Sequence, residues 1–429
     1  MTTIRMCQLY NCSSMATTAQ LRPRPWRATR VRIVPVPAFS RASQARHPGA
    51  FDSQRMANSR TGIKQKISYR RQGKFPIVRA GAGCNNAGMT YPRSQLVSEH
   101  QAGFYHVVSR CVRRAFLCGQ DPVTGQSFEH RRQWIEARIL ELADCFAVSV
   151  YAYAIMHNHF HIVLRVDPAA TANWTNEEIA QRWLTAFPGR LKDNDSPEMA
   201  ERFALALLGN AERLAEVRQR LGSLSWFMKA LNEPIARRAN REDNCTGKFW
   251  EGRFKCQALL EEHAVLSCMA YVDLNPARAA ICDTLAESDH TSIQRRLRER
   301  DTGKANGQTR RSLPERPLQP VAGLDADTLL GMTESSYIDL VQWTGEQARP
   351  DKRGRLRALN DEKTGAPADV WQISHPKAWV SQVQGTESAY FRAIGSAEAL
   401  MAKAESLGQV WMKGVAGEAA RKILRERPS

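Results

Sequence analysis

The chain has 429 residues, of which 61 are Lys or Arg and 43 are Asp or Glu, so it is basic, with a formal net charge of +18. Its length and its 43% of hydrophobic residues allow a buried core and more than one domain, which excludes a mini-protein and a collagen-like chain. The longest nearly apolar stretch, 146–156, is shorter than the roughly 18 residues of a membrane-spanning helix, so none is expected. The ten cysteines show no Cys-x-x-Cys spacing, which favours reduced thiols over a disulfide framework or a cysteine zinc site.

Residues 1–88 hold most of the excess positive charge. They contain sixteen Lys and Arg residues and a single acid, Asp52, and they are rich in Pro, Gly and Ser without a hydrophobic period, so no independent fold is expected. A basic nucleic-acid-binding arm and a transit peptide both fit this composition. Because well-patterned sequence begins directly after Met89, we favour a third interpretation, in which residues 1–88 are a mis-assigned start.

After residue 103 the hydrophobic periods predict a series of secondary-structure elements. Alternation predicts strands and 3.6-residue spacing predicts helices in the order strand 104–112, helix 130–145, strands 146–156 and 159–166, helix 223–241, strand 249–260 and helix 261–274. This βαββαβ order with a further helix predicts an α+β fold with a ferredoxin-like antiparallel sheet. We expect this domain to span 89–293 with a helical insertion at about 167–222, followed by a linker and a helical C-terminal region over 294–429.

The sequence Met-His-Asn-His-Phe-His at 156–161 leads into the third predicted strand. Side chains alternate along a strand, so His159 and His161 face the same way while Phe160 points into the opposite layer. Two imidazoles aimed at one point are typical of a metal site, although a His-x-His pair on a strand is more often structural. His157 falls in the turn before the strand.

A second feature lies about 110 residues further on, in a segment that runs from Tyr271 to Ala279. Tyr271 and Asn275 are four residues apart and share a helix face if the helix extends that far, which Pro276 makes approximate. Taken singly, an ordinary semi-buried tyrosine and a helix-capping asparagine are the simpler interpretations.

Together these motifs resemble those of the REP-associated tyrosine transposases, within the superfamily of single-tyrosine transposases and HUH nucleases. The resemblance covers about residues 89–293. It is carried by four blocks in order: 109–119 (SRCVRRAFLCG), 156–161 (MHNHFH), 247–255 (GKFWEGRFK) and 271–279 (YVDLNPARA).

The resemblance implies a DNA endonuclease that cleaves and rejoins single-stranded DNA at hairpin elements through a 5′-phosphotyrosine intermediate. Tyr271 would be the nucleophile, and His159 and His161 would hold a divalent metal ion, Mg²⁺ or Mn²⁺. Asn275 is our choice for the third ligand because an amide oxygen suits a hard cation. Asp273, Glu251 and Glu261 are competing candidates, and Asp273 is expected to point away from Tyr271.

Basic and aromatic side chains in the matching blocks are candidates for contacts with DNA phosphates and bases. They are Arg110, Arg113, Arg114, Trp250, Arg253, Lys255 and Arg278. Two other functions stay open: a metal-dependent hydrolase in which water attacks, and a non-cleaving regulator that binds hairpins. The expected location is the cytoplasm of a bacterium, at the nucleoid, and the sequence does not distinguish a monomer from a homodimer.

Overall fold

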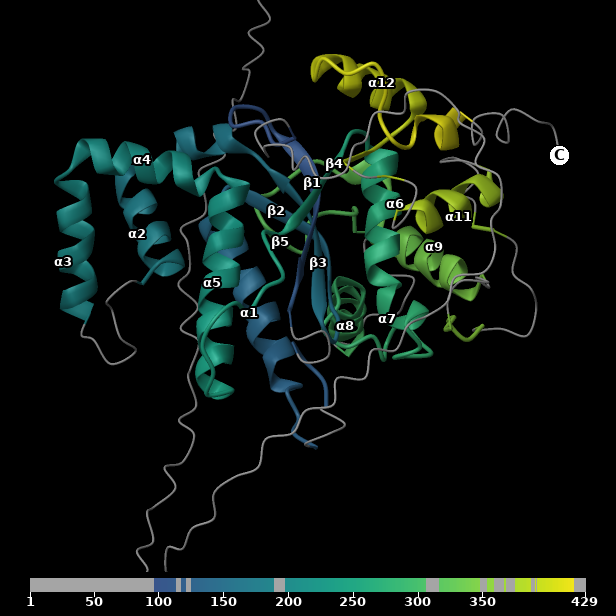
Figure 1. The fold of residues 1–429 in the computed structure, drawn as a ribbon, viewed down its shortest axis with the longest axis horizontal. Helices are drawn as coiled ribbons and strands as arrows, with labels where there is room; N and C mark the ends of the chain where they lie inside the picture. The colour runs from purple at the N-terminus through teal and green to yellow at the C-terminus, as the bar shows by residue number, and fades with distance from the viewer. Residues whose placement is uncertain are drawn as a thin grey trace, which may run out of the picture. The chain divides into compact units, whose positions relative to one another are not determined.

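The computed structural model describes residues 96–112, 117–120, 125–188, 197–305, 316–347, 353–358, 366–367, 375–386, 390 and 392–419. The segment 1–88, and with it the unit Met1–Gly83, lies outside these residues. Within the unit Cys84–Ser429, the described residues form a six-stranded sheet with helices on both faces (Figure 1), so the expected α+β class is confirmed. None of the described helices combines the length and hydropathy of a membrane span.

The strands lie in the order β5-β2-β3-β1-β4-β6. Their bounds are β1 Gly103–Arg110, β2 Val148–Ile155, β3 His159–Val166, β4 Lys255–Leu259, β5 Ala322–Gly323 and β6 Ala393–Ile394. Every neighbouring pair is antiparallel except β4 and β6, which are parallel. The four strands predicted from alternation are therefore consecutive, in the order β2-β3-β1-β4.

Helices α1 (His130–Cys145) and α5 (Leu224–Glu242) cover one face of the sheet. The spacing predicted α1 with these bounds, and the helix buries Ile135, Ile139 and Leu142, whose positions repeat at helical intervals. A hydrogen bond of 2.9 Å from Asn232 of α5 to Ser109 of β1 ties the second helix to the same face.

Helix α6 (Glu262–Asp273) lies on the opposite face, against β2, β3 and β4 (Figure 1). Its last turn ends at Leu274, and the short helix α7 (Asn275–Arg278) follows directly, with Pro276 in its first turn. Proline lacks a backbone N–H and disfavours helical geometry in the residue before it, which accounts for the break between α6 and α7 close to the predicted helix end at residue 274.

Four helical segments stand among the described residues between β3 and α5, at the position of the expected insertion. They are η2 Pro168–Asn173, α2 Asn176–Ala186, α3 Pro197–Leu208 and α4 Ala211–Leu221. Helix α2 begins with a reciprocal capping box, in which the Thr175 side chain accepts from the backbone of Glu178 and the Glu178 carboxylate accepts from the backbone of Thr175. The insertion lies beside α5, away from α6 (Figure 1).

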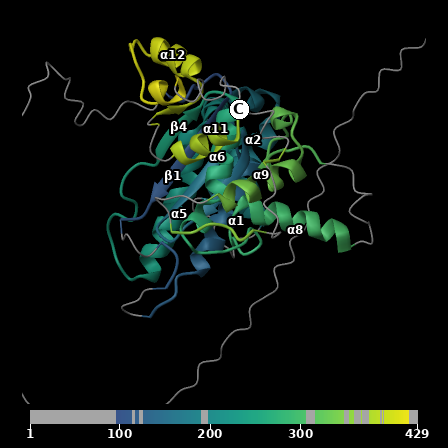
Figure 2. The same cartoon turned by 90° about the vertical axis from the view of Figure 1, so that its right-hand side faces the viewer.

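The C-terminal region adds helices to the α6 side and one short strand to each edge of the sheet. Its helices are α8 Ser292–Ala305, η3 Leu329–Gly331, α9 Glu334–Glu346, α11 Pro376–Gly385 and α12 Ala397–Ser406. Helices α9 and α11 contact α6 (Figures 1 and 2). Strand β5 contains Gly323 at a φ of +98°, where a Cβ atom would lie 2.0 Å from the carbonyl oxygen of Val148, so only glycine fits. The region expected to be a linker and helices thus also completes the sheet.

Candidate active site

The strand register places a row of polar side chains on the sheet face that α6 covers. Cross-strand partners share a face, and His161 pairs with Val108 while His159 pairs with Arg110. Alternation along β1 then puts His106 on this face too, and its partner on β4 is Gln257. Three histidines therefore face α6 from two adjacent strands.

The three imidazoles are close neighbours. The rings of His159 and His161 have centroids 4.8 Å apart, and those of His106 and His161 have centroids 5.1 Å apart with planes only 8° from parallel. In the second pair, Nε2 of His106 lies 2.9 Å from Nδ1 of His161, so the rings meet edge to edge through a hydrogen bond.

Hydrogen bonding determines which nitrogen of each ring carries the proton. An amide oxygen only accepts, so Nδ1–H of His106 donates to Oε1 of Gln257 at 2.8 Å, and its Nε2 accepts from Nδ1–H of His161. In the same way, Nδ1–H of His159 donates to Oδ1 of Asn158 at 2.5 Å. Both His159 and His161 therefore carry a lone pair on Nε2, the tautomer of a metal-ligating imidazole.

Burial keeps these rings neutral. It lowers the pKa of His106 to about 4, and burial together with the Arg110 cation lowers the pKa of His159 to about 4. Burial holds the pKa of His161 well below its ordinary value, and the neighbouring His159 adds to the effect. At neutral pH the three imidazoles are uncharged, and only an uncharged imidazole binds a metal ion.

The Nε2 atom of His161 is buried and has no hydrogen-bond partner among the residues that the structure describes. A buried polar atom without a partner costs free energy, and such atoms often mark a site for a ligand or an ion. This observation fits a metal ion, as do the two imidazole lone pairs. No set of three His, Cys, Asp or Glu side chains in the described part of the chain is grouped to hold one, so other ligands would have to be amide oxygens, water or substrate.

Helix α6 brings Tyr271 to the histidines. The phenol ring lies edge to face with His161 at a centroid distance of 5.7 Å and with His106 at 6.1 Å. The side chain is largely buried, with 8% of its surface exposed. The structure therefore unites the tyrosine and the imidazoles that the sequence singled out, although about 110 residues separate them.

Asn275 lies one turn beyond Tyr271, at the start of α7, and is partly buried. Its amide nitrogen donates to the backbone carbonyl oxygen of Tyr271 at 3.2 Å, a contact typical of an asparagine that caps the end of a helix. This hydrogen bond uses the NH₂ group of the amide. The amide oxygen is the atom that a metal ion would bind.

Two of the competing carboxylates serve the fold. Asp273 is buried, and its oxygens accept from Ser292 at 2.5 Å and from the hydroxyl of Tyr337 at 2.5 Å, which ties α6 to α8 and α9. It thus points away from Tyr271, as expected. Glu261 caps the start of α12 by accepting from the backbone and hydroxyl of Ser396 at 2.9 and 2.8 Å.

Three of the candidate DNA-contacting cations are exposed, and two of them lie on the histidine face of the sheet. Arg110 and Lys255 lie on the same sheet face as His159, and both cations help to lower its pKa. Arg253 is exposed in the loop before β4, as is the third competing carboxylate, Glu251. Arg113 and Arg114 lie outside the described residues.

The side chains of Arg278 and Trp250 make contacts that serve the fold. The guanidinium of Arg278 is buried and donates to the carbonyl oxygens of Thr344 and Gln347 at 2.7 Å each, so it closes the C-terminal end of α9. The indole N–H of Trp250 donates to the carbonyl oxygen of Asn232 at 3.0 Å, and its ring packs against Phe160 on the far face of the sheet. The buried Arg278 guanidinium is therefore committed to the fold, and the partly buried Trp250 ring lies on the sheet face opposite to the histidines.

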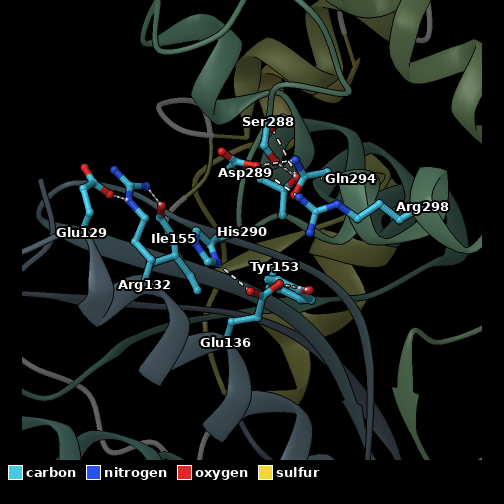
Figure 3. Close-up of polar contacts among 11 residues, drawn as sticks. Glu129, Arg132, Glu136, Tyr153, Ile155, Ser288, Asp289, His290, Gln294 and Arg298 are labelled. Carbon is cyan, nitrogen blue, oxygen red and sulfur yellow. Dashed lines mark hydrogen bonds and ion pairs between the residues drawn. The ribbon is translucent and has the colours of Figure 1, made fainter. Parts of the chain in front are cut away.

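Residues of α1 and of the segment before it hold the turn between β2 and β3. Arg132 of α1 donates to the carbonyl oxygen of Ile155 at the end of β2 (Figure 3), and the backbone N–H of Cys118 donates to the carbonyl oxygen of His157 at 2.9 Å. The His157 ring packs against Gly119, at a φ of +102°, where a Cβ atom would lie 2.8 Å from it. His157 therefore serves the turn and stays out of the imidazole cluster.

The chain matches no protein-family model and no curated protein sequence. Among solved structures, it is similar to a REP-associated tyrosine transposase bound to a REP hairpin, with 12% identity and a TM-score of 0.27 over 54% of this chain and 91% of that one. A likeness this low carries no argument about fold or function, so the function has to be inferred from the site itself.

Proposed function

We propose that this protein is a single-tyrosine HUH transposase of the REP-associated type, which cleaves and rejoins single-stranded DNA at hairpin elements. The observation that carries the proposal is the position of Tyr271, whose ring lies 5.7 Å from that of His161, a buried neutral imidazole with an unpartnered Nε2. The four ordered sequence blocks support it. The neighbouring strands β2-β3-β1-β4 in a βαββαβ order are consistent with the ferredoxin-like arrangement that the proposal requires.

In the proposed reaction, Oη of Tyr271 attacks the phosphorus of a DNA phosphodiester. The Oη–P bond forms while the bond from phosphorus to the 3′ oxygen breaks, the phenol proton is lost to solvent, and the 3′ oxygen leaves as a hydroxyl after taking up a proton. The ester bond between tyrosine and phosphate replaces the DNA ester bond that was broken. A 3′-OH can therefore reverse the step and rejoin the strand without ATP.

A phenol with an ordinary pKa of about 10 attacks a phosphate anion poorly unless the negative charge is offset. We assign His159 and His161, through their Nε2 atoms, and the amide oxygen of Asn275 as ligands of Mg²⁺ or Mn²⁺, which when bound would supply positive charge to the phosphate. The buried strands hold both imidazoles in place, and α6 holds the phenol in reach of them.

The cations at the rim of the site fit a nucleic-acid substrate. Arg110 and Lys255 lie on the histidine face and Arg253 lies close by along the chain, all exposed, where they would contact phosphates that lead to the scissile one. Single-stranded DNA is the proposed partner because a tyrosine on a helix reaches a phosphate more easily outside a duplex. A protein with this partner would act in the bacterial cytoplasm, at the nucleoid.

The proposal is tested with an oligonucleotide that carries an inverted repeat and its unpaired flanks from the DNA beside the gene. Incubation with Mg²⁺ or Mn²⁺ should produce a protein–DNA adduct that survives denaturation, and peptide mapping should place it on Tyr271. Free 5′-phosphate ends without an adduct would indicate a hydrolase, and hairpin binding without cleavage would indicate a regulator.

A further inference from the structure

We propose that His106 and Gln257 are positioning residues that lock His161 in the tautomer with its lone pair on Nε2. This inference rests on the proposed function, because it assigns His106 and Gln257 a role toward the metal ligand His161. Neither residue belongs to the motifs that the sequence singled out, and neither is proposed to contact metal or DNA.

The lock is a chain of two hydrogen bonds that crosses three adjacent strands. Gln257 on β4 accepts from Nδ1–H of His106 on β1 at 2.8 Å, and Nε2 of His106 accepts from Nδ1–H of His161 on β3 at 2.9 Å. His106 and Gln257 are direct cross-strand partners, and both histidines are about 95% buried. Backbone hydrogen bonds join the three strands, so they hold the side chains of Gln257, His106 and His161 next to one another.

The side-chain amide of Gln257 determines which atom donates in each of the two hydrogen bonds. The oxygen of Gln257 cannot donate, so His106 must carry its proton on Nδ1, and the neutral His106 ring must then accept at Nε2. His161 is left with one possible neutral form, protonated on Nδ1 and bare on Nε2. A metal-ligating histidine commonly donates its second ring N–H in this way to a carboxylate, a backbone carbonyl or water. Here a second imidazole takes that place.

The unpartnered Nε2 atom of His161 distinguishes this series of hydrogen bonds from that of an ordinary buried pair of histidines. A structural pair satisfies its polar atoms, because a buried polar atom without a partner destabilises the fold. Here the hydrogen bonds with Gln257 and between the two rings satisfy every ring nitrogen except Nε2 of His161, which has no partner in the described part of the protein. The hydrogen bonds therefore deliver one free lone pair to the face where Tyr271 lies.

A separate hydrogen bond sets His159 in the same tautomer, with its proton on Nδ1. Its Nδ1–H donates to Oδ1 of Asn158, the residue just before it in the turn. The two ligands are thus set in the same tautomer by different partners, one local and one across the sheet. Removing His106 should affect His161 alone, which makes the inference separable from the behaviour of His159.

The test has two readouts on the full chain without DNA. The first is ¹⁵N NMR of the metal-free, histidine-labelled protein, which distinguishes a protonated from a bare ring nitrogen. The second is the affinity for Mn²⁺ measured by electron paramagnetic resonance. The variants are His106→Phe, which removes the acceptor but keeps a ring, His106→Gln, which offers an amide oxygen, and Gln257→Leu, which breaks the far end. His130→Gln is the control, because His130, the first residue of α1, is exposed and forms an ion pair with Glu242 at the end of α5.

In the wild type we expect His161 to be protonated on Nδ1 before any metal is added. His106→Phe and Gln257→Leu should abolish this preference and weaken Mn²⁺ binding about 10- to 100-fold, the usual effect of losing such a partner. His106→Gln should restore both, and His130→Gln should change neither. If His106→Phe does not fold, as its thermal melting would reveal, Gln257→Leu carries the test because it leaves the imidazole pair in place.

An Nε2-protonated His161 in the wild type, or unchanged Mn²⁺ affinity in folded His106→Phe or Gln257→Leu, would overturn the inference. Failure of the proposed function looks different. In that case the wild type shows the expected tautomer and the variants behave as described, but no DNA adduct forms on Tyr271.

Discussion

The phenol ring of Tyr271 meets the imidazole of His161 edge to face, with centroids 5.7 Å apart and ring planes at 82°. One residue lies on a helix and the other on the strand that it covers, and both are largely buried. The proposed function makes Tyr271 the nucleophile and His161 a metal ligand that act on the same phosphate, and each residue can be removed separately.

Replacing either histidine ligand should abolish the DNA adduct, but the two variants should differ in stability. Loss of the charge that offsets the phosphate costs several kcal/mol, so His159→Ala and His161→Ala should each reduce adduct formation by on the order of a hundredfold or more. His161→Ala also leaves Nε2 of His106 buried without its donor, which costs about 1–3 kcal/mol. Thermal melting should therefore show a lower Tm for His161→Ala than for the less buried His159→Ala.

Asn275→Ala should have a milder effect than either histidine substitution. Water can replace one neutral oxygen ligand, so the variant should need more Mn²⁺ for half-maximal adduct formation yet reach a similar final level. The Mn²⁺ titration of adduct formation measures this directly. An unchanged titration would remove Asn275 from the ligand set without affecting the roles of His159 and His161.

Arg110 and Arg278 should separate DNA binding from folding. Arg110 is exposed on the histidine face, so Arg110→Ala should weaken hairpin binding and lower the slope of log affinity against log salt by about 0.7 for one lost single-strand phosphate contact. Arg278 closes α9, so Arg278→Ala should lower the free energy of unfolding by about 1–3 kcal/mol. Folded Arg278→Ala should bind DNA with the wild-type salt slope, and a reduced slope would return Arg278 to the DNA-binding surface.

Asp273 should make stability depend on pH. Burial raises the pKa of its carboxyl group from 3.8 to about 6, against the opposing effect of the hydrogen bonds from Ser292 and Tyr337. The folded state therefore holds the proton more tightly than the unfolded state, so the stabilisation is full below pH 3.8 and is lost as the pH rises through 6. Asp273→Asn removes this loss, so its free energy of unfolding relative to wild type should rise by on the order of 2 kcal/mol between pH 4 and pH 7. Denaturant titrations at the two pH values check this, and a constant difference would contradict the raised pKa.

Hydrophobic patterning predicted β1, β3 and α6, which build most of the site, because each of them spans at least eight residues. Helix 130–145 and strand 159–166 have the same bounds in the sequence and in the structure. The predicted strand 249–260 is shorter, since only Lys255–Leu259 joins the ladder, and Trp250 instead bridges to Cys111. Strands β5 and β6 span two residues each, too few to show any period.

The residues that sequence reasoning missed or misplaced depend on long-range pairing. His106 lies in the strand predicted over 104–112, and alternation places it on the face of Arg110, but only the register with β3 shows that it meets His161. Arg278 could not be recognised as a helix cap, because α9, whose carbonyl oxygens it binds, begins 56 residues later, at Glu334. Local spacing shows which way a side chain faces, and tertiary contacts decide what it touches.

The central claim is that Tyr271 becomes joined to the 5′ phosphate of cleaved DNA. It is tested most directly with a hairpin oligonucleotide that carries one fluorophore at its 5′ end and another at its 3′ end, incubated with Mn²⁺ and separated on a denaturing gel. For the wild type we predict that the 3′ label migrates with the protein while the 5′ label is released on a free fragment that ends in a 3′-OH. Tyr271→Phe should bind the hairpin and leave both labels on the intact oligonucleotide. Cleavage by Tyr271→Phe, or a wild-type reaction that releases both labels on free DNA fragments, would contradict the claim.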